Sequence, residues 1–319
     1  MIHGVNDSRI VPVFIFSLPR TGSTLLQRLL AVHPDVSTAA EPWMLLPILY
    51  ARRERGVVAE YGHRSQVRAF EDFRRRLPRA DEDVDEAIRT FALALYEKAS
   101  DAGSRYFIDK TPRYHLVVED IIRVFGSSAR YLFLWRNPLA VVASIISTWG
   151  EGRWKFNAYH VDLFKGLASL TDAFRRYSAT AHSLNYENLV KEPRAELEAC
   201  LDYIGLDPLE DLVDRFATIH LPGRMGDHTG VSRYQSVSSE PLDSWKNVIV
   251  GPYRRAWARR YLSWIGSERL ETMGYDSQLL LEELASTPKL RIGRASDPWY
   301  EAMGLAKESV RTYFISRLS

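Results

Sequence analysis

One short segment near the N-terminus restricts the possible folds of this chain more than any other. Residues 11–16 form an apolar run typical of a buried strand, and residues 22–32 carry leucines at helical spacing. The turn Ser17-Leu-Pro-Arg-Thr-Gly-Ser-Thr24 joins the two. A buried strand, a tight turn and a helix in this order are typical of an α/β fold with a parallel sheet.

Further strand and helix patterns alternate along the chain. The strand candidates are residues 105–108, 130–134 and 182–186. The helix candidates are residues 114–125, 139–148, 159–181, 193–204 and 250–274. Strands that alternate with helices are joined by crossover connections, which give parallel strands. We therefore expect the α/β class, a three-layer fold with a central, mainly parallel sheet flanked by helices.

The domain organisation follows from these patterns. We expect one domain over residues 1–275, with a helical insert at about 43–100, and a C-terminal helical tail over 276–319. In the insert, Val84, Ile88, Phe91 and Leu95 predict one apolar helix face. The arginines of the insert are interpreted as a solvated helix face; they are Arg52, Arg53, Arg55, Arg74, Arg75 and Arg76. Residues 221–247, rich in Gly, Ser and Pro, predict a long surface loop.

Composition excludes several classes of protein. Hydrophobic residues are 46% and charged residues 26% of the chain, which is ordinary for a globular protein. The net charge of +2 does not mark a nucleic-acid binder. Cys200 is the single cysteine, so no internal disulfide forms, and the polar N-terminus lacks a signal-peptide pattern. We expect a cytoplasmic location and, without an apolar run of roughly 18 residues, no transmembrane segment.

The turn after the first strand has the chemistry of an oxyanion site. In open α/β sheets ligands bind at the carboxyl ends of strands, where the next helix directs its free N–H groups. Gly22 allows close approach of the backbone, Ser23 and Thr24 add hydroxyls, and Arg20 adds a guanidinium. The alternative is an ordinary strand–helix connection with a capping serine.

The same turn departs from the loop of ATP and GTP hydrolases. Ser17 stands where that loop has its first glycine, and Ser23 stands where it has its lysine. The cation that contacts the β- and γ-phosphates is therefore missing from its usual place. This departure disfavours a nucleoside-triphosphate hydrolase.

A second element can hold another phosphate. Arg136, in Arg-Asn-Pro, follows the strand candidate 130–134, and Ser144 lies about two turns along the next helix. An arginine at the carboxyl end of a strand and a hydroxyl on the following helix can share one anion. The alternative is a surface arginine and a small packing serine.

Together these elements resemble the sulfotransferase family. Residues 19–25, Pro-Arg-Thr-Gly-Ser-Thr-Leu, resemble its 5′-phosphosulfate-binding loop, and Arg136…Ser144 resembles its 3′-phosphate-binding segment. The pattern is similar to that of bacterial sulfotransferases and the related tyrosylprotein sulfotransferases, and it covers most of residues 10–275. The resemblance implies a five-stranded α/β domain of P-loop nucleotide-hydrolase type. It also implies a PAPS-dependent enzyme, whose donor is 3′-phosphoadenosine 5′-phosphosulfate (PAPS), without a metal.

The resemblance assigns the donor-binding residues one by one. Those for the 5′-phosphosulfate would be Arg20, Thr21, Gly22, Ser23 and Thr24. Arg136 and Ser144 would hold the 3′-phosphate, and Tyr186 would lie beside the adenine.

Three catalytic residues also come from the resemblance. Glu41, in Ala-Glu-Pro, matches the catalytic glutamate of the tyrosylprotein enzymes and would act as general base. Lys110, in Asp-Lys-Thr-Pro, would stabilise the leaving phosphate, and Arg20 would neutralise charge beside it. The alternatives are that Glu41 is a first-turn helix acid, that Lys110 is a surface residue, and that His33 is the base.

Two departures from the family pattern bear on these assignments. Small-molecule sulfotransferases carry a lysine where Arg20 stands and a catalytic histidine elsewhere. The tyrosylprotein enzymes carry a further arginine where this chain has Thr148. Arg233, Ser236 and Lys246 in the late loop are further candidates for contact with the donor.

The acceptor is open at the level of sequence. The insert and the late loop carry the candidate pocket residues Trp43, Tyr61, Arg224 and Tyr234. These aromatic and basic residues are compatible with a hydroxyl acceptor that is a small molecule such as a phenol or a polyketide, a sugar, a lipid or a peptide tyrosine. An atypical P-loop kinase that uses ATP is the alternative enzyme, and a nucleotide-binding interaction protein is a third hypothesis. The tail from Tyr300 can pack on its own domain or on a second copy, so an oligomer is possible.

Overall fold

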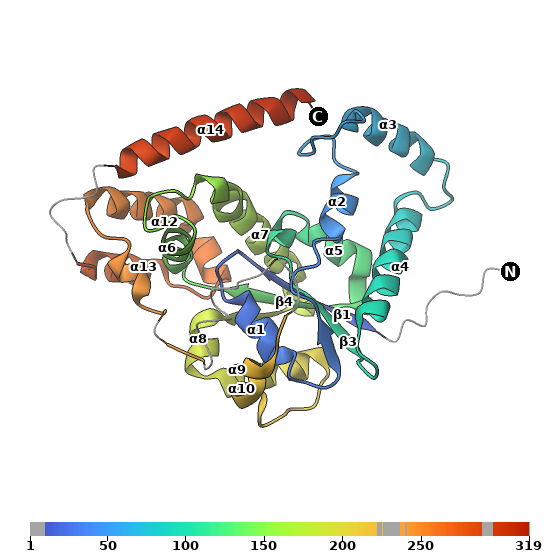
Figure 1. Cartoon of the computed structure of the whole chain (residues 1–319), viewed down its shortest axis with the longest axis horizontal. Helices are drawn as coiled ribbons and strands as arrows, with labels where there is room; N and C mark the ends of the chain where they lie inside the picture. The colour runs from blue at the N-terminus through green and yellow to red at the C-terminus, as the bar shows by residue number, and fades with distance from the viewer. Residues whose placement is uncertain (1–9, 222–224, 226–236, 240, 289–295, 319) are drawn as a thin grey trace.

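A five-stranded parallel sheet forms the centre of the molecule (Figure 1). The computed structural model describes residues 10–221, 225, 237–239, 241–288 and 296–318. The strands are β1 (Val11–Ser17), β2 (Val36–Thr38), β3 (Tyr106–Asp109), β4 (Arg130–Trp135) and β5 (His182–Asn185). They lie in the order β2-β3-β1-β4-β5, and each neighbouring pair is parallel.

Helices cover both faces of this sheet. They are α1 (Ser23–Leu30), α2 (Leu45–Tyr50), α3 (His63–Arg74), α4 (Asp81–Ala99), α5 (Val118–Phe125), α6 (Pro138–Thr148), α7 (Leu167–Tyr177), α8 (Tyr186–Lys191), α9 (Pro193–Ile204), α10 (Leu212–Arg215), α12 (Pro252–Thr272), α13 (Ser277–Ser286) and α14 (Asp297–Leu318). Figure 1 shows α1, α8, α9 and α10 on one side of the sheet and α4, α5, α6 and α7 on the other. The predicted three-layer α/β fold is confirmed.

The central strand β1 is apolar along almost its whole length because both of its faces are buried. Phe14 and Phe16 of β1 point into the core shared with α4 to α7, whereas Val13 and Ile15 point into the core shared with α1 and α9. A strand covered on both faces cannot alternate polar and apolar residues.

The strand order creates a topological switch point beside β1. The chain leaves β1 through α1, reaches β2 at one edge, and returns to pair β3 with β1. It then passes through α5 and pairs β4 with the other side of β1. Connections that leave a strand in opposite directions open a crevice at its carboxyl end, which is where ligands bind in such sheets.

Most predicted elements are present with small differences in their bounds. The four strand candidates correspond to β1, β3, β4 and β5, while β2 was not predicted because its three residues are too short to show a pattern. Tyr186 begins α8 instead of ending a strand. The insert is helical over α2, α3 and α4 only, with non-helical backbone at residues 51–62.

The predicted apolar face of α4 was wrong by one position in its second half. Val84 and Ile88 are buried as expected, but Phe91 is 47% exposed and Leu95 is 40% exposed. Ala92 and Tyr96 occupy the buried positions, at 0% and 1% exposure. Spacings of three and four residues both fit a helix, and the more apolar pair was the wrong choice.

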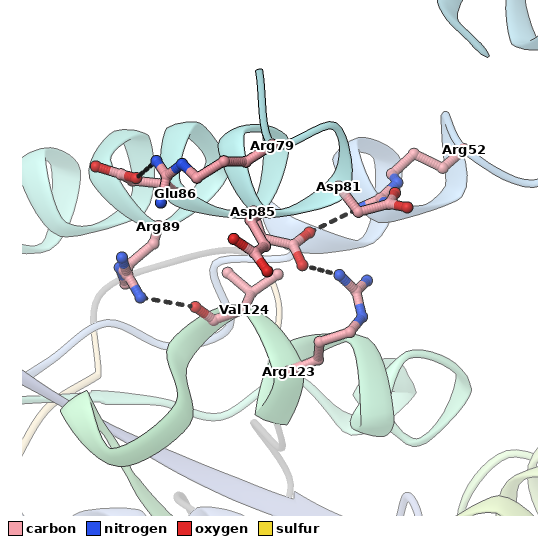
Figure 2. A pocket seen from close by; sticks show the side chains of 9 residues that line it. Arg52, Arg79, Asp81, Asp85, Glu86, Arg89, Arg123 and Val124 are labelled. Carbon is pink, nitrogen blue, oxygen red and sulfur yellow. Dashed lines mark hydrogen bonds and ion pairs between the residues drawn. The ribbon is translucent and has the colours of Figure 1, made fainter. Parts of the chain in front are cut away.

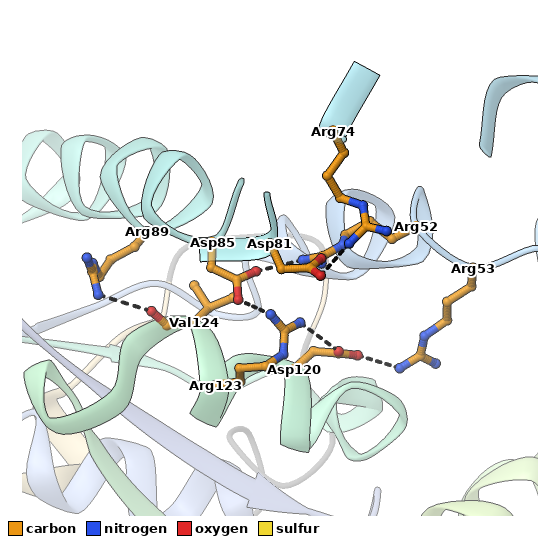
Figure 3. Close-up of polar contacts among 9 residues, drawn as sticks. All are labelled: Arg52, Arg53, Arg74, Asp81, Asp85, Arg89, Asp120, Arg123 and Val124. Atoms are coloured by element: carbon orange, nitrogen blue, oxygen red, sulfur yellow. Dashed lines mark hydrogen bonds and ion pairs between the residues drawn. The ribbon is translucent and has the colours of Figure 1, made fainter. Parts of the chain in front are cut away.

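The solvated-face interpretation was also wrong for part of the arginine cluster. Arg52 lies 2.6 Å from Asp85 and also pairs with Asp81, and Arg123 of α5 pairs with Asp85 as well (Figures 2 and 3). Arg53 lies 2.6 Å from Asp120. These ion pairs join the segment that follows α2 to α4 and α5, and Arg52, Asp81, Asp85 and Arg123 line a pocket of about 630 Å³ (Figure 2). The interpretation holds for exposed members of the cluster; they are Arg55, Arg75 and Arg76.

A buried ion pair anchors the C-terminal helix. Arg254 on α12 donates from Nε to Asp297 Oδ2 at 2.7 Å and from Nη2 to Oδ1 at 3.0 Å. Both side chains are almost fully buried. The tail helix therefore starts at Asp297, earlier than the predicted Tyr300. No helix in the described ranges combines the length and the apolar character needed to cross a bilayer.

Candidate active site

The carboxyl ends of the strands carry the predicted site residues, in the spatial order of the sheet. Glu41 follows β2 and Lys110 follows β3, on one side of the loop after β1. Arg136 follows β4 and Tyr186 follows β5, on the other side. With about 4.8 Å between neighbouring strands, these groups are spread over roughly 20 Å of one edge. The sequence patterns that suggested separate motifs thus converge on one site.

The loop between β1 and α1 is sharply turned. Arg20 has a φ angle of 67° and Gly22 has one of 91°. The Thr21 hydroxyl donates to the carbonyl of Leu18 at 2.7 Å, which closes the turn. No side chain in the described part of the chain caps α1, so the N–H groups of its first turn face the loop. This is the arrangement that binds an anion.

Gly22 is needed here for space as well as for its backbone angle. A Cβ on this residue would lie 2.3 Å from Cδ2 of Tyr186. The ring of Tyr186 therefore packs directly on the loop backbone. The ring also contacts the guanidinium of Arg136, whose central carbon lies 4.4 Å from the ring centroid.

Arg136 is a buried cation within the described residues that has no carboxylate partner there. Its Nη1 donates to the carbonyl of Arg20 at 2.8 Å, and Nη2 donates to that of Pro241 at 3.3 Å. Its Nε is buried and has no partner in the described structure. Burial lowers the pKa of this guanidinium. Because a buried charge without a counterion is costly, the site is suited to a bound anion.

Arg20 lies against the helix that follows Arg136. Its Nε donates to the Ser144 hydroxyl at 3.1 Å, and its Nη2 donates to that of Thr148 at 3.4 Å. The guanidinium also lies 5.4 Å from the ring of Trp149. The resemblance assigned Arg20 to the 5′-phosphosulfate, but these contacts are with the segment assigned to the 3′-phosphate. Two arginines and two hydroxyls are thus gathered at this side of the loop.

Glu41 and Lys110 form a buried ion pair on the opposite side of the loop. Lys110 Nζ lies 2.8 Å from Glu41 Oε1 and 3.3 Å from the hydroxyl of Thr24. The Lys110 side chain is 1% exposed and that of Glu41 is 8% exposed. The surface interpretation of Lys110 is therefore wrong. So is the first-turn interpretation of Glu41, because α2 begins only at Leu45.

The rival base, His33, lies at the opposite end of the strands from Glu41. Its Nδ1 accepts the backbone N–H of Asp35 at 3.1 Å, in the turn between α1 and β2. The carbonyl of Asp35 accepts from the backbone N–H of Tyr106, where β3 begins. His33 therefore sits at the amino ends of the strands, away from Lys110, and cannot act in the same site.

Sequence reasoning missed the groups that support Glu41. The indole N–H of Trp43 donates to Glu41 Oε2 at 3.0 Å, although Trp43 was considered only as a pocket residue. Asp109, buried at the end of β3, accepts hydrogen bonds from three hydroxyls. Burial raises the pKa of Asp109 to about 6. The sequence signal that could have identified Asp109 is its position as a carboxylate at the end of an apolar strand.

The remaining candidates divide into described and undescribed residues. Arg224, Arg233, Tyr234 and Ser236 lie outside the residues that the structure describes. Lys246 pairs with Asp243 at 2.6 Å. Tyr61 is 67% exposed. The late segment nevertheless contacts the site, since the carbonyl of Pro241 accepts from Arg136.

A central parallel strand, an anion-binding loop at its end and flanking basic groups define an α/β fold of the P-loop nucleotide-hydrolase type. The model of the sulfotransferase family matches residues 12–211. The chain therefore belongs to the sulfotransferase family, as its sequence predicted. This match favours sulfuryl transfer over the kinase alternative.

Named relatives agree with this assignment. The chain is 28% identical over 292 residues to the nodulation protein NoeE of Sinorhizobium fredii, an alignment that covers 83% of this chain and 66% of NoeE, slightly less than two thirds. It is 21% identical over 243 residues to a putative protein-tyrosine sulfotransferase of Caenorhabditis briggsae, with 73% of this chain and 80% of the relative covered.

Solved structures support the fold. The sulfotransferase domain from the curacin biosynthetic pathway has a TM-score of 0.52 at 21% identity, with 83% of this chain and 97% of that domain covered. The sulfotransferase domain of the Synechococcus PCC 7002 olefin synthase has a TM-score of 0.51 at 22% identity, with 74% and 87% covered. At this identity the likeness concerns the fold.

Proposed function

We propose that this enzyme transfers the sulfuryl group of PAPS to a hydroxyl acceptor, with Glu41 as general base. One observation carries the proposal: the buried Lys110–Glu41 pair and the buried Arg136 lie on opposite sides of the loop after β1. A donor with a phosphosulfate at one end and a second phosphate at the other needs anion-binding groups on both sides of that loop.

The residues present fit such a donor. The uncapped first turn of α1, with Thr21 to Thr24, would hold the 5′-phosphosulfate. Arg136 and Ser144 would hold the 3′-phosphate, and the unpaired Nε of Arg136 offers a donor to it. Arg20, which hydrogen-bonds Ser144, would extend from the loop to the 3′-phosphate and so take the place of the arginine that Thr148 replaces. Tyr186, packed on Gly22, would lie beside the adenine.

The proposed reaction is an in-line displacement at sulfur. The acceptor oxygen forms a bond to sulfur while its proton passes to Glu41, and the bond between sulfur and the bridging oxygen breaks. The electron pair of that bond stays with the departing phosphate, whose charge Lys110 would stabilise. Lys110 contacts both Thr24 of the loop and Glu41, so it lies between the donor site and the base.

The acceptor would approach from the side of Glu41. Trp43 contacts Glu41 at the start of the helical insert, and a small molecule, a sugar, a lipid and a peptide are all compatible acceptors there. The cytoplasmic location, the division at residue 275 and the possible oligomer stay predictions.

Cys200 is buried in α9, and burial raises the pKa of its thiol to about 12, which fits a structural role.

The catalytic role of Glu41 is tested by Glu41→Gln. Transfer from PAPS to a panel of hydroxyl compounds, including 4-nitrophenol, a tyrosine ester, a glucoside and a fatty alcohol, is followed by mass spectrometry. We expect turnover to fall by about 10²–10⁴-fold, the usual contribution of a general base. Binding of 3′-phosphoadenosine 5′-phosphate, measured by calorimetry, stays unchanged. Exposed Glu210 provides the control variant Glu210→Gln. Near-normal turnover of Glu41→Gln would remove this residue from the mechanism.

The nucleotide is tested separately by thermal shift. We expect 3′-phosphoadenosine 5′-phosphate to raise the melting temperature and ATP with Mg²⁺ to leave it unchanged, since the loop lacks the lysine that contacts the γ-phosphate. A shift with ATP and Mg²⁺ alone would favour the kinase alternative.

A further inference from the structure

Two backbone N–H groups shortly after Glu41 donate hydrogen bonds to side chains of the segment that follows β3. Trp43, which donates its indole N–H to Glu41, has a φ angle of 56°. Its backbone N–H donates to the hydroxyl of Thr111 at 3.2 Å. The backbone N–H of Leu45 donates to the hydroxyl of Tyr114 at 3.3 Å. Both accepting hydroxyls belong to the chain that follows β3.

One carboxylate orients both of these hydroxyls. Thr111 donates its proton to Asp109 Oδ1 at 3.2 Å, and Tyr114 donates its proton to Asp109 Oδ2 at 2.9 Å. A hydroxyl has one proton and can accept through its remaining lone pairs. A backbone N–H can only donate, so each hydroxyl accepts from the N–H that faces it and donates its single proton to Asp109. By accepting both protons, Asp109 fixes the orientation of the two hydroxyls, so that a lone pair of each faces residues 43–45.

We propose that Asp109 is a positioning residue for the general base, acting through Thr111 and Tyr114 on the segment that carries Trp43 and Glu41. This inference rests on the proposed role of Glu41. Asp109 also directly precedes Lys110 in the chain. Both members of the buried ion pair are thus positioned from the end of β3: Lys110 follows Asp109 in the chain, and Glu41 is linked to Asp109 through hydrogen bonds.

The network contains its own control. Tyr96 of α4 also donates to Asp109 Oδ2, at 2.6 Å, and is as deeply buried as Tyr114. Among the described hydrogen bonds, the Tyr96 hydroxyl accepts no N–H from residues 43–45, whereas that of Tyr114 does. Tyr96→Phe and Tyr114→Phe thus each remove one buried hydroxyl from the same carboxylate oxygen, and only the second cuts the connection to the Glu41 segment.

The test compares these two variants with Thr111→Val and Thr111→Ser. Transfer from PAPS is measured with the most active acceptor of the panel above. We expect Tyr114→Phe and Thr111→Val to lower kcat by about tenfold to 10²-fold, since small displacements of a catalytic group have effects of this size. Tyr96→Phe and Thr111→Ser keep kcat within about threefold of the wild type. The affinity for 3′-phosphoadenosine 5′-phosphate stays unchanged in all four.

A second readout does not depend on the acceptor. Amide hydrogen exchange of a peptide spanning residues 41–46 should become faster in Tyr114→Phe and Thr111→Val and stay slow in Tyr96→Phe and Thr111→Ser. Equal losses of kcat and protection in the two tyrosine variants would mean that Asp109 only stabilises the fold, and this would overturn the inference. Unchanged kcat and protection in Tyr114→Phe and Thr111→Val would overturn it as well. Failure of the base itself is visible separately, as full activity of Glu41→Gln.

Discussion

Arg20 and Arg136 lie close together although both are cations, because a hydrogen bond to the loop backbone holds Arg136 beside Arg20. The guanidinium of Arg136 donates to the carbonyl of Arg20, while the guanidinium of Arg20 turns away to Ser144 and Thr148. Two cations are therefore fixed side by side through backbone and hydroxyl oxygens. A phosphate bound beside them, as proposed for the donor, would accept charge-assisted hydrogen bonds from guanidinium groups.

Arg20→Ala should change the preference of the enzyme between two nucleotides. We expect it to weaken binding of 3′-phosphoadenosine 5′-phosphate by about 1.5–3 kcal/mol, the range for hydrogen bonds to charged groups. Binding of AMP, which lacks the 3′-phosphate, should weaken less, because Arg20 contacts the segment assigned to that phosphate. Calorimetry of both nucleotides measures the difference. Equal losses for the two would show that Arg20 serves the 5′ side alone.

Asp109 should make stability depend on pH in a definite direction. Burial, opposed by the hydroxyls of Tyr96, Tyr114 and Thr111 and by Lys110, raises its pKa from 3.8 to about 6. The folded chain thus binds this proton more tightly, so the stabilisation is full below about pH 4 and is lost as the pH rises through about 6. The difference corresponds to about 3 kcal/mol.

Urea unfolding of the wild type and Asp109→Asn at several pH values measures this effect. Asn has no carboxyl proton to release, so the stability of the wild type relative to the variant should fall between about pH 4 and pH 7. Parallel curves for the two proteins would contradict the assignment.

The residues predicted for the site were those with a recognisable local pattern. The loop, Arg136 and Lys110 each follow a strand candidate, so their place at one edge could be inferred from the sequence. The roles of Trp43 and Asp109 could not, because they depend on contacts with Glu41 and with Thr111 and Tyr114 that form only in three dimensions. The side-chain direction of Arg20 was likewise set by α6.

At the scale of elements, the loop after β1 packs so closely on the first residue of α8 that position 22 has no room for a side chain. Gly22→Ala should weaken nucleotide binding and lower the melting temperature, since the new methyl group meets the Tyr186 ring and the φ angle of 91° strains any other residue. Gly103→Ala is a matched control, with a φ angle of 95° and nothing within 4 Å of the new Cβ.

The two variants separate the steric effect from the backbone effect. We expect both to lose stability through the left-handed backbone, and Gly22→Ala alone to lose affinity for 3′-phosphoadenosine 5′-phosphate. If Gly103→Ala reduced that affinity equally, close packing on Tyr186 would not explain the result.

Two elements show where sequence patterns stop being sufficient. β2 has only three residues, and its place at the sheet edge depends on pairing with β3, which no local pattern encodes. On α4, Tyr96 is buried because its hydroxyl has a partner in Asp109, so a polar atom decided which face turned inward. In both cases a distant contact outweighed local preference.

At the scale of the whole molecule, the Arg254–Asp297 pair attaches α14 to α12. Asp297→Asn leaves Arg254 buried without a counterion and should lower the free energy of unfolding by about 3 kcal/mol. Asp211→Asn is the control, since its pair with Arg215 is half exposed and contributes less than about 1 kcal/mol. Urea unfolding measures both. Equal effects would mean that α14 contributes little to the folded domain.

The spatial order of the site differs from its order along the chain. The residues proposed for the base, the donor loop, the phosphate contacts and the adenine contact follow five strand ends, and the last of them, Tyr186, is far from the loop in the sequence. A nascent chain that has emerged only as far as β4 lacks Tyr186 and the complete site, so the proposed nucleotide would bind only the finished fold. A ligand that binds only the finished fold stabilises it, by about 2.7 kcal/mol at a hundred times its dissociation constant. We therefore expect 3′-phosphoadenosine 5′-phosphate to slow the proteolysis of the purified protein.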